Sequence, residues 1–182
     1  TASERTMVQK YIVDSVLYWN KEYHIDGFRF DLVGLIDAET MNAVVQAVHA
    51  VNPDIIFYGE GWSMSSGTTK GTIPMATQAD AKSNLSKGIL SDLAYFSDTF
   101  RDNLAGNNTN GQGFVLGYAE KEEIMKACFT ASTDWCPGPT YTVNYASCHD
   151  NYTLMDKLNV AAADATEEER IKMNNLSAAF YM

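Results

Sequence analysis

Two short apolar runs separated by a helical pattern constrain the fold of this chain most strongly. The run Asp26–Asp31 is aromatic-rich and follows a polar turn, and Ile55–Tyr58 is apolar throughout. Between them, Ala38–Val51 carries its apolar residues with the 3.6-residue period of a helix, and Asn52–Asp54 ends it. Apolar strands joined by a single helix are typical of parallel βαβ connections. The sequence therefore predicts an α/β fold with a parallel sheet.

The same rules predict further elements along the chain. They are helices over Met7–Asn20, around Phe100–Leu104 and after Thr166, strands within Ile89–Phe96 and over Thr140–Ala146, and loops over 61–88 and 106–113. Four strands with covering helices fit a section of a (β/α)8 TIM barrel, and a small doubly wound sheet is the alternative. We interpret residues 1–182 as one domain, and as an internal fragment of a larger barrel because the chain ends inside an apolar helix.

Composition and cysteine usage exclude several kinds of partner. The formal net charge of −10 is spread along the chain, so nucleic acid is not an expected partner. No apolar run reaches the ~18 residues that span a bilayer, so no membrane partner is expected. The chain has three cysteines, Cys128, Cys136 and Cys148, which are odd in number and form no CxxC pair. This pattern favours neither a disulfide framework nor a structural zinc site. No metal site is predicted. Cys148 is expected to be buried in packing.

Three of the four predicted strands are followed by a carboxylate. Asp31, Glu60 and Asp150 each stand where an apolar run ends. Because the carboxyl ends of parallel strands share one edge of a sheet, we expect these carboxylates to converge there, where barrel enzymes assemble their sites. For any one of them, a helix-capping or turn-capping role is the simpler interpretation. Three on one edge make a catalytic site a serious alternative.

The neighbours of two of these carboxylates differ. Arg29 lies two residues before Asp31, so both side chains project from the same face of the strand, and the guanidinium favours the ionised carboxylate. Glu60 has Tyr58 and Trp62 at the same offset, and a carboxyl group among aromatic faces is pushed towards its neutral form. One ionised and one protonated carboxyl group are what cleavage of a glycosidic bond needs.

Three ordered motifs carry a family resemblance. Gly27–Asp31, Gly59–Trp62 and His149–Asn151 resemble the second, third and fourth sequence signatures of the α-amylase superfamily, glycoside hydrolase family 13. Their spellings are most similar to those of the type I pullulanase group, whose members cut α-1,6 branches. The first signature of the superfamily, which supplies a further substrate-binding histidine on the third barrel strand, does not occur here.

The resemblance implies a role for each matching residue. It makes Asp31 the nucleophile, Glu60 the general acid/base and Asp150 the third carboxylate that holds sugar hydroxyls in the transition state. Arg29 would orient Asp31, and His149 would hydrogen-bond the sugar. Trp62 and Asn151 would contribute substrate contacts. The fold it implies is the central part of the barrel, strands four to seven.

The resemblance also implies what the parent protein acts on. The expected substrate is an α-glucan polysaccharide or oligosaccharide with α-1,6 linkages, as in pullulan, starch or glycogen, cleaved by a retaining double displacement. The alternatives are an α-1,4-acting amylase, an isoamylase-type enzyme, and a non-catalytic glucan-binding domain. No cofactor is required, although some superfamily members bind calcium, and the acidic surface permits calcium in the full-length parent without specifying a site. We expect the isolated chain to be inactive and to self-associate through its open strand edges. Its localisation is not indicated, and a bacterial parent fits either an extracellular or a cytoplasmic place.

Overall fold

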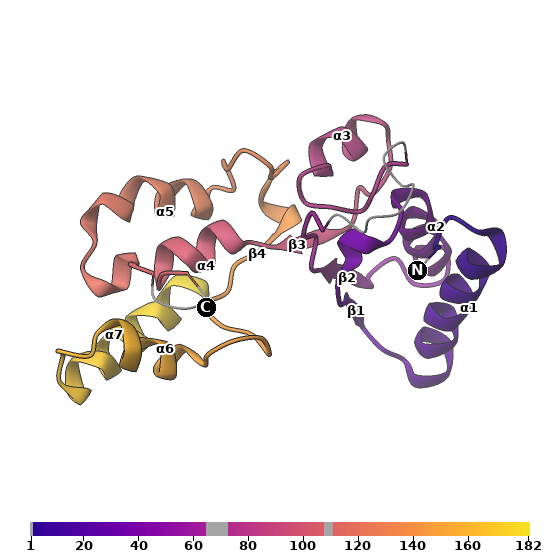
Figure 1. Ribbon diagram of the computed structural model, residues 1–182. Helices are drawn as coiled ribbons and strands as arrows, with labels where there is room; N and C mark the ends of the chain where they lie inside the picture. Colours follow the sequence, from indigo (N-terminus) through magenta and orange to yellow (C-terminus); the bar gives the residue numbers. More distant parts are fainter. Residues whose placement is uncertain (1, 65–72, 108–110) are drawn as a thin grey trace. The chain divides into compact units, whose positions relative to one another are not determined.

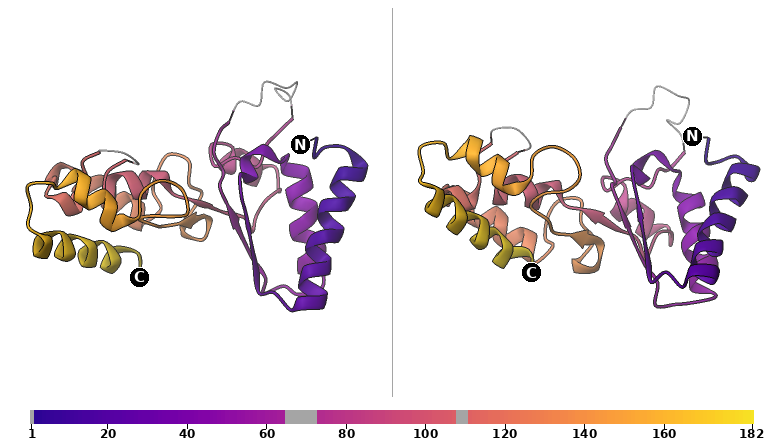
Figure 2. Two further views of the ribbon diagram at one scale, coloured as in Figure 1. Left: turned by 60° about the horizontal axis from the view of Figure 1, so that its bottom comes forward. Right: turned by 90° about the horizontal axis from the view of Figure 1, so that it is seen from below.

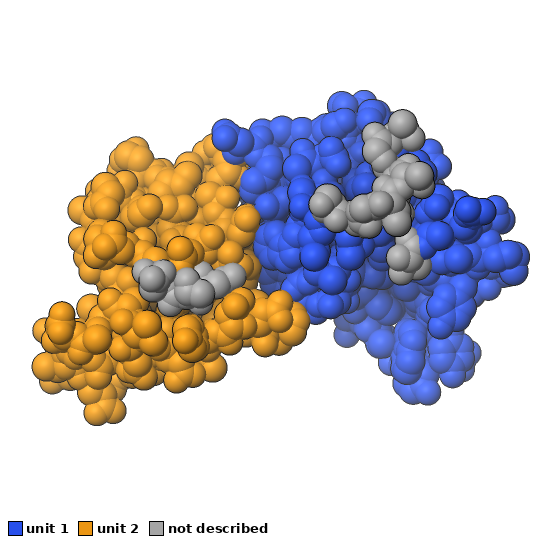
Figure 3. Space-filling view, viewed as in Figure 1, with its two compact units in different colours: residues 1–96, 134–142 blue, residues 97–133, 143–182 orange. Residues whose placement is uncertain are grey.

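The computed structural model describes residues 2–64, 73–107 and 111–182 (Figure 1). The predicted loop residues 65–72 and 108–110 lie outside the described residues. The chain forms two compact units (Figure 3). Unit 1 comprises residues 1–96 and 134–142, and unit 2 comprises residues 97–133 and 143–182. The chain therefore crosses between the units three times, and each unit has a core of its own.

Unit 1 contains the parallel strands. Its strands are β1 (Gly27–Phe30), β2 (Ile56–Gly59) and β3 (Ala94–Phe96), and β4 (Thr142–Val143) lies at the boundary with unit 2. The sheet order among the described residues is β1-β2-β3-β4. β1 pairs with β2 in parallel, and β2 with β3, and the helix α2 (Ala38–His49) connects β1 to β2. The prediction of an α/β fold with a parallel sheet is confirmed.

Two helices cover one face of β1 and β2. α1 (Thr6–Tyr23) packs beside α2, and both lie on the same side of the strands (Figure 2). Val44 and Val48 of α2 are fully buried, and they share a core with Phe57 of β2. The aromatic ring of Phe57 also stacks on Phe28 of β1, with centroids 5.8 Å apart. Burying each such side chain contributes about 1.5–3 kcal/mol, so this layer fixes the strands against the helices.

Residues that alternate with this aromatic layer project from the opposite face. Arg29 is in register with Tyr58, and Phe30 with Gly59. Since successive side chains of a strand point to opposite faces, Arg29 and Tyr58 lie on the side that α1 and α2 do not cover. The isoleucine at the start of β2, Ile56, is 65% exposed on the same side. This face therefore positions the candidate site.

The predicted loop between β2 and β3 contains a helix that the sequence analysis missed. α3 (Ala81–Ser86) is only six residues long. It is held by Asn84, which is buried and donates its side-chain amide to the carbonyl of Met75 at 2.9 Å. Six residues are too few to show a helical period, and the segment is stabilised by this non-local bond instead.

Unit 2 is helical. Its α-helices in the described residues are α4 (Asp98–Leu104), α5 (Glu122–Phe129), α6 (Leu154–Ala161) and α7 (Glu167–Tyr181). Phe100 and Leu104 of α4, Met125 of α5 and Leu158 of α6 are buried in one core. The turn through Phe100 and Leu104 was predicted, whereas α5 and α6 were not. No described helix is long and apolar enough to cross a membrane.

Capping residues define where these helices begin. Ser97 accepts a hydrogen bond from the Phe100 amide at the start of α4, at 3.1 Å. Thr166 and Glu169 form the predicted capping box at the start of α7, with both reciprocal bonds present. Each such cap contributes about 1 kcal/mol, so the polar residues at these positions set where the two helices begin.

The fourth strand is shorter than predicted. The sequence pattern extends it over Thr140–Ala146, but β4 contains only Thr142 and Val143. The Val143 carbonyl still accepts from the Ser97 amide at 3.0 Å. Ala146, three residues on, packs into the helical core of unit 2 instead. The apolar residues that suggested a longer strand are buried against helices, so the pattern alone gave the wrong end.

Candidate active site

The first two candidate carboxylates stand where the sequence predicted. Asp31 directly follows β1, and Glu60 directly follows β2. Their neighbours Arg29 and Tyr58 are aligned across the two strands. The two-residue offset therefore directs all of these side chains to the face that α1 and α2 leave open.

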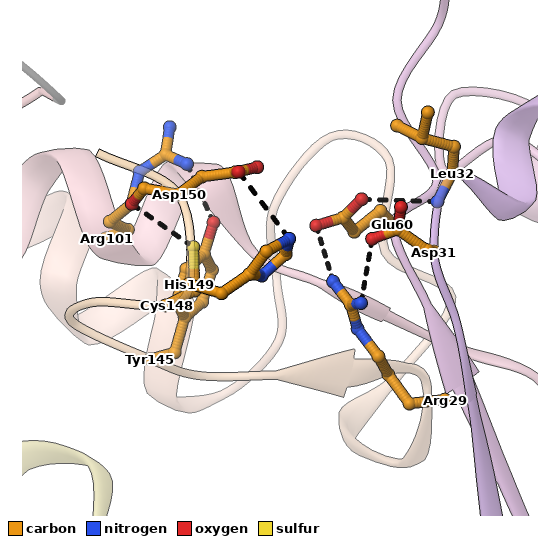
Figure 4. A network of polar contacts seen from close by, with 9 residues as sticks. All are labelled: Arg29, Asp31, Leu32, Glu60, Arg101, Tyr145, Cys148, His149 and Asp150. Atoms are coloured by element: carbon orange, nitrogen blue, oxygen red, sulfur yellow. Dashed lines mark hydrogen bonds and ion pairs between the residues drawn. The ribbon is translucent and has the colours of Figure 1, made fainter.

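One guanidinium binds the two candidate carboxylates in unit 1, those of Asp31 and Glu60 (Figure 4). Arg29 donates from Nη1 to Asp31 Oδ1 at 2.7 Å and from Nη2 to Glu60 Oε1 at 2.6 Å. The Glu60 side chain is only 5% exposed and the Asp31 side chain is 59% exposed. A charge-assisted bond to a buried carboxylate is much stronger than one to an exposed carboxylate. The contact with Glu60 is therefore the stronger of the two.

The Arg29 side chain is itself held by an aromatic ring. Its guanidinium carbon lies 5.6 Å from the centroid of Phe96, at the end of β3. Phe96 also packs edge-on against Tyr58, with ring centroids 5.5 Å apart. Three successive parallel strands thus contribute to the placement of one arginine.

Both oxygens of the Glu60 carboxylate accept hydrogen bonds, which the sequence argument did not anticipate. The sequence argument placed Glu60 among the aromatic faces of Tyr58 and Trp62. In the structure, Oε1 accepts from Arg29 and Oε2 accepts from the backbone N–H of Leu32 at 3.2 Å. The donors to Glu60 come from β1 and from the turn after it. The residues next to Glu60 in the sequence give no sign of these contacts.

Backbone bonds fix the segment that carries Glu60. Its N–H donates to the carbonyl of Phe30 and its own carbonyl accepts from Gly34, both at 3.1 Å. A Cβ at Gly34 would lie 2.3 Å from the Trp62 carbonyl oxygen, so only glycine allows this close approach. Trp62 is half-buried. Its proposed contact with substrate stays a prediction.

The remaining candidate residues lie together in unit 2. His149, Asp150 and Asn151 are consecutive and exposed, and His149 Nε2 lies 3.5 Å from Asp150 Oδ1. Asn151 adopts a left-handed conformation with φ of 65°, which turns the chain at this point. Asp150 does not directly follow β4, because that strand ends at Val143. The convergence of Asp150 with Asp31 and Glu60 stays a prediction.

The cysteine before His149 was assigned the wrong environment. Cys148 is exposed, whereas Cys128 and Cys136 are buried, and all three are free thiols. Its sulfur contacts the carbonyl of Asp150 at 3.8 Å (Figure 4). The segment leaves the strand at Val143, so the alternation of a strand no longer determines which side chains are buried.

Arg101 of α4 supports the same segment within unit 2. It donates from Nη1 to the hydroxyl of Tyr145 at 2.7 Å, and its guanidinium carbon lies 5.6 Å from that ring centroid (Figure 4). Its Nε donates to Asp102 at 2.7 Å. Burial raises the pKa of Tyr145 to about 12, so its hydroxyl stays neutral and can accept the bond at ordinary pH. Sequence reasoning missed Arg101, since nothing local links residues 101 and 145.

Comparison with known proteins gives matches over the whole chain. The chain is 32% identical to the pullulanase of Bacillus subtilis (strain 168), with all of this chain and 25% of the relative covered. It is 31% identical to the pullulanase of Klebsiella aerogenes, again over its full length and over 20% of the relative. The chain thus spans a fifth to a quarter of the length of these curated relatives. No protein family model matches the sequence.

Solved structures give the same result. The pullulanase of Anoxybacillus sp. LM18-11, in complex with maltotetraose, matches with a TM-score of 0.90 and 41% identity, over 98% of this chain and 25% of that one. The chain is a pullulanase-like segment. The type I pullulanase of Bacillus subtilis, in complex with maltose, matches with a TM-score of 0.88 and 32% identity. This match extends over 98% of this chain and 25% of the solved chain.

Proposed function

We propose that the whole protein containing this segment is a retaining glycoside hydrolase that cuts α-1,6-glucosidic linkages in pullulan, starch or glycogen. The observation that carries the proposal is the Arg29 guanidinium bound to both Asp31 and Glu60. Similarity to pullulanases over the full chain supports the substrate class. Two of those solved relatives are complexes with maltotetraose and maltose. The segment would supply strands four to seven of a (β/α)8 barrel, whose carboxyl-terminal edge holds the site.

The two candidate carboxylates in unit 1, Asp31 and Glu60, suit a double displacement. Before the first step, Glu60 has to take up a proton. In that step it gives the proton to the glycosidic oxygen as the C1–O bond breaks, and an Asp31 oxygen bonds to C1. In the second step, the Glu60 carboxylate takes a proton from water, whose oxygen bonds to C1 and releases Asp31. Retention requires carboxyl groups about 5–5.5 Å apart, and a guanidinium that binds both is compatible with a short separation.

Arg29 and Leu32 are arranged for the charge that this reaction creates. When Glu60 gives up its proton, a carboxylate forms in a side chain that is 5% exposed. Donors already aimed at both of its oxygens stabilise that charge without reorganisation. Asp150 would hold sugar hydroxyls in the transition state, with contacts from His149, Asn151 and Trp62.

An α-1,4-acting amylase is the competing function. An intracellular maltogenic amylase of Bacillus subtilis is 42% identical, but over only 55 residues and 30% of the chain. The pullulanases match over the whole chain, which favours α-1,6 cleavage. Release of maltotriose from pullulan by the whole protein would support the proposal, and action on linear amylose alone would contradict it.

Substrates with different leaving groups separate the roles of the carboxylates. In the full-length protein, Glu60→Gln should lower kcat/KM for pullulan by about 10²–10⁴-fold. It should spare an α-maltosyl fluoride, whose leaving group needs no proton. Asp31→Asn and Asp150→Asn should lower kcat/KM for both substrates, because these residues act on the sugar itself. If Glu60→Gln lowered kcat/KM equally for both substrates, Glu60 would not be the general acid.

Two matched carboxylates serve as controls for this experiment. Asp54 is exposed and precedes β2, at the strand end away from Glu60, and Asp164 is exposed in unit 2. Asp54→Asn and Asp164→Asn each remove one surface charge and should leave kcat/KM within about twofold of the wild type. A loss comparable to that of Asp31→Asn would show that general surface charge, and not the proposed site, controls turnover.

Self-association of the isolated chain is the second part of the proposal. Among the described residues, β1 pairs on one side only, with β2, and its four residues contain no Pro or Lys. An unpaired, unprotected edge favours pairing with a second copy. Light scattering after size-exclusion chromatography, across a dilution series, should give masses above that of a monomer. A monomer peak that persists at high concentration would refute this part.

A further inference from the structure

Leu32 has an unusual backbone conformation beside the candidate acid. Its φ and ψ are 51° and 42°, in the left-handed region that residues with a Cβ rarely adopt. It immediately follows Asp31 and immediately precedes the 3-10 turn η1 (Val33–Leu35). Leucine has no side-chain polar group that could favour this conformation, as Asn or Asp would. Something other than local preference therefore holds Leu32 there.

The conformation directs the Leu32 N–H at Glu60. That N–H donates to Oε2 at 3.2 Å, while Arg29 occupies Oε1 (Figure 4). Two donors on the two oxygens of one carboxylate fix both its position and its rotation. With Glu60 almost wholly buried, these contacts take the place of water around the carboxylate.

The turn after Leu32 is fixed to the same segment. The Gly34 N–H donates to the Glu60 carbonyl at 3.1 Å, and the Gly34 Cα packs against the Trp62 carbonyl. η1 is closed by the bond from Leu35 N–H to the Leu32 carbonyl, at 2.9 Å. The backbone on either side of Leu32 is therefore anchored, so the direction of its N–H depends on the left-handed conformation.

We propose that Leu32 is a positioning residue for the acid/base step, and that its left-handed backbone, not its side chain, performs the role. This inference rests on the proposed function, in which Glu60 gives up and then takes back a proton. The Leu32 N–H stabilises the Glu60 carboxylate that forms in the first step and keeps its oxygens correctly oriented for the second. No contact of Leu32 with the sugar is needed.

Three substitutions separate the backbone from the side chain. Leu32→Gly and Leu32→Ala both remove the side chain, but only glycine adopts the left-handed conformation without steric cost. Leu32→Val keeps an apolar side chain, but its branched Cβ opposes that conformation. If the N–H matters, kcat/KM for pullulan in the full-length protein should follow the order Gly, then Ala, then Val. If side-chain packing matters, the valine variant should be best and the glycine variant worst.

The leaving group again provides the readout that a merely structural role would not move. We expect Leu32→Val to lower kcat/KM for pullulan by about tenfold, because an aimed donor to a charged group is lost. The loss for α-maltosyl fluoride should stay below about threefold, since its first step needs no acid. Leu32→Gly should stay within about threefold of the wild type on both substrates. If the valine variant does not fold, the alanine and glycine pair decides the question alone.

Glu60→Gln, measured in parallel, separates failure of this inference from failure of the proposed function. If Glu60→Gln discriminates between the two substrates but the glycine variant is worse than the valine and alanine variants, Leu32 acts through packing and the inference is wrong. Equal activity of all three Leu32 variants and the wild type would also overturn it. If Glu60→Gln itself does not discriminate, the proposed function fails first.

Discussion

The shared arginine makes unequal contributions to its two partners, and this inequality can be measured. Arg29→Met keeps the aliphatic stem that packs near Phe96 but removes the charge from between Asp31 and Glu60. The Glu60 side chain, 5% exposed, is then left as a buried carboxylate without its ion-pair partner. Breaking a buried pair in this way costs about 3–5 kcal/mol. The Asp31 side chain is 59% exposed, so its pair contributes only about 0–1 kcal/mol.

Two double-mutant cycles test these magnitudes. Arg29→Met is combined with Glu60→Gln in one cycle and with Asp31→Asn in the other, in the full-length protein. Arg29→Met alone should lower the Tm of the catalytic domain by roughly 6–20 °C, at about 2–4 °C per kcal/mol. Its cost should fall by about 2 kcal/mol or more when Glu60 is already neutral, and by less than about 1 kcal/mol when Asp31 is neutral.

Differential scanning calorimetry gives all of these values from one set of variants. Arg5→Met is a suitable control, because Arg5 is exposed and its bond to Glu4 is long at 3.9 Å. It should change the stability by no more than about 0.5 kcal/mol. Equal coupling of Arg29 to both carboxylates, or stronger coupling to Asp31, would refute the argument that burial decides which contact is the stronger.

Two further predictions concern a glycine and a buried lysine. Gly34→Ala should lower the Tm by roughly 2–10 °C, because its Cβ would meet the Trp62 carbonyl oxygen at 2.3 Å. Gly138→Ala should have little effect, since the backbone there is extended and a Cβ meets only Tyr141, at 4.0 Å. In unit 2, burial lowers the pKa of Lys157 to about 8, from its usual 10.5. Between these values the unfolded chain binds a proton that the folded chain does not, so stability relative to Lys157→Met should rise from pH 8 to pH 10.5. Thermal melts of both proteins across that range would show this, and a constant difference in Tm would contradict it.

The strongest local patterns predicted the parallel sheet. The helical period over Ala38–Val51 gave α2, and the apolar run before Glu60 gave β2, because the side chains of both are buried in one core. The capping box at Thr166 could also be predicted from the sequence, because all of its bonds lie within four residues. Short helices could not. α5 and α6 have eight residues each, and a period of 3.6 is barely repeated over that length.

The candidate site could be predicted only in part from the sequence, for a different reason. Strand ends placed Asp31 and Glu60, and the two-residue offset paired Arg29 with Asp31. The stronger contact, between Arg29 and Glu60, depends on the register of β1 against β2, which aligns Arg29 with Tyr58. No pattern within a single strand specifies that register. The signal that would have suggested the contact is the presence of polar residues on the same face of two neighbouring strands. The bond from the Leu32 N–H could not be predicted, because leucine disfavours the conformation that makes it.

The alternation of β1 and β2 separates what stabilises unit 1 from what would act on substrate. Phe28 and Phe57 point into the layer of α1 and α2, whereas Arg29 and Glu60 project from the other side. Substitutions in the layer packed under α1 and α2 should therefore lower the stability of unit 1 more than they disturb the Arg29 contacts. The backbone of β1 links the arginine to the packed face. The aromatic core on one face already holds the strands in register. The polar residues on the face that α1 and α2 do not cover are therefore not needed to hold the strands together.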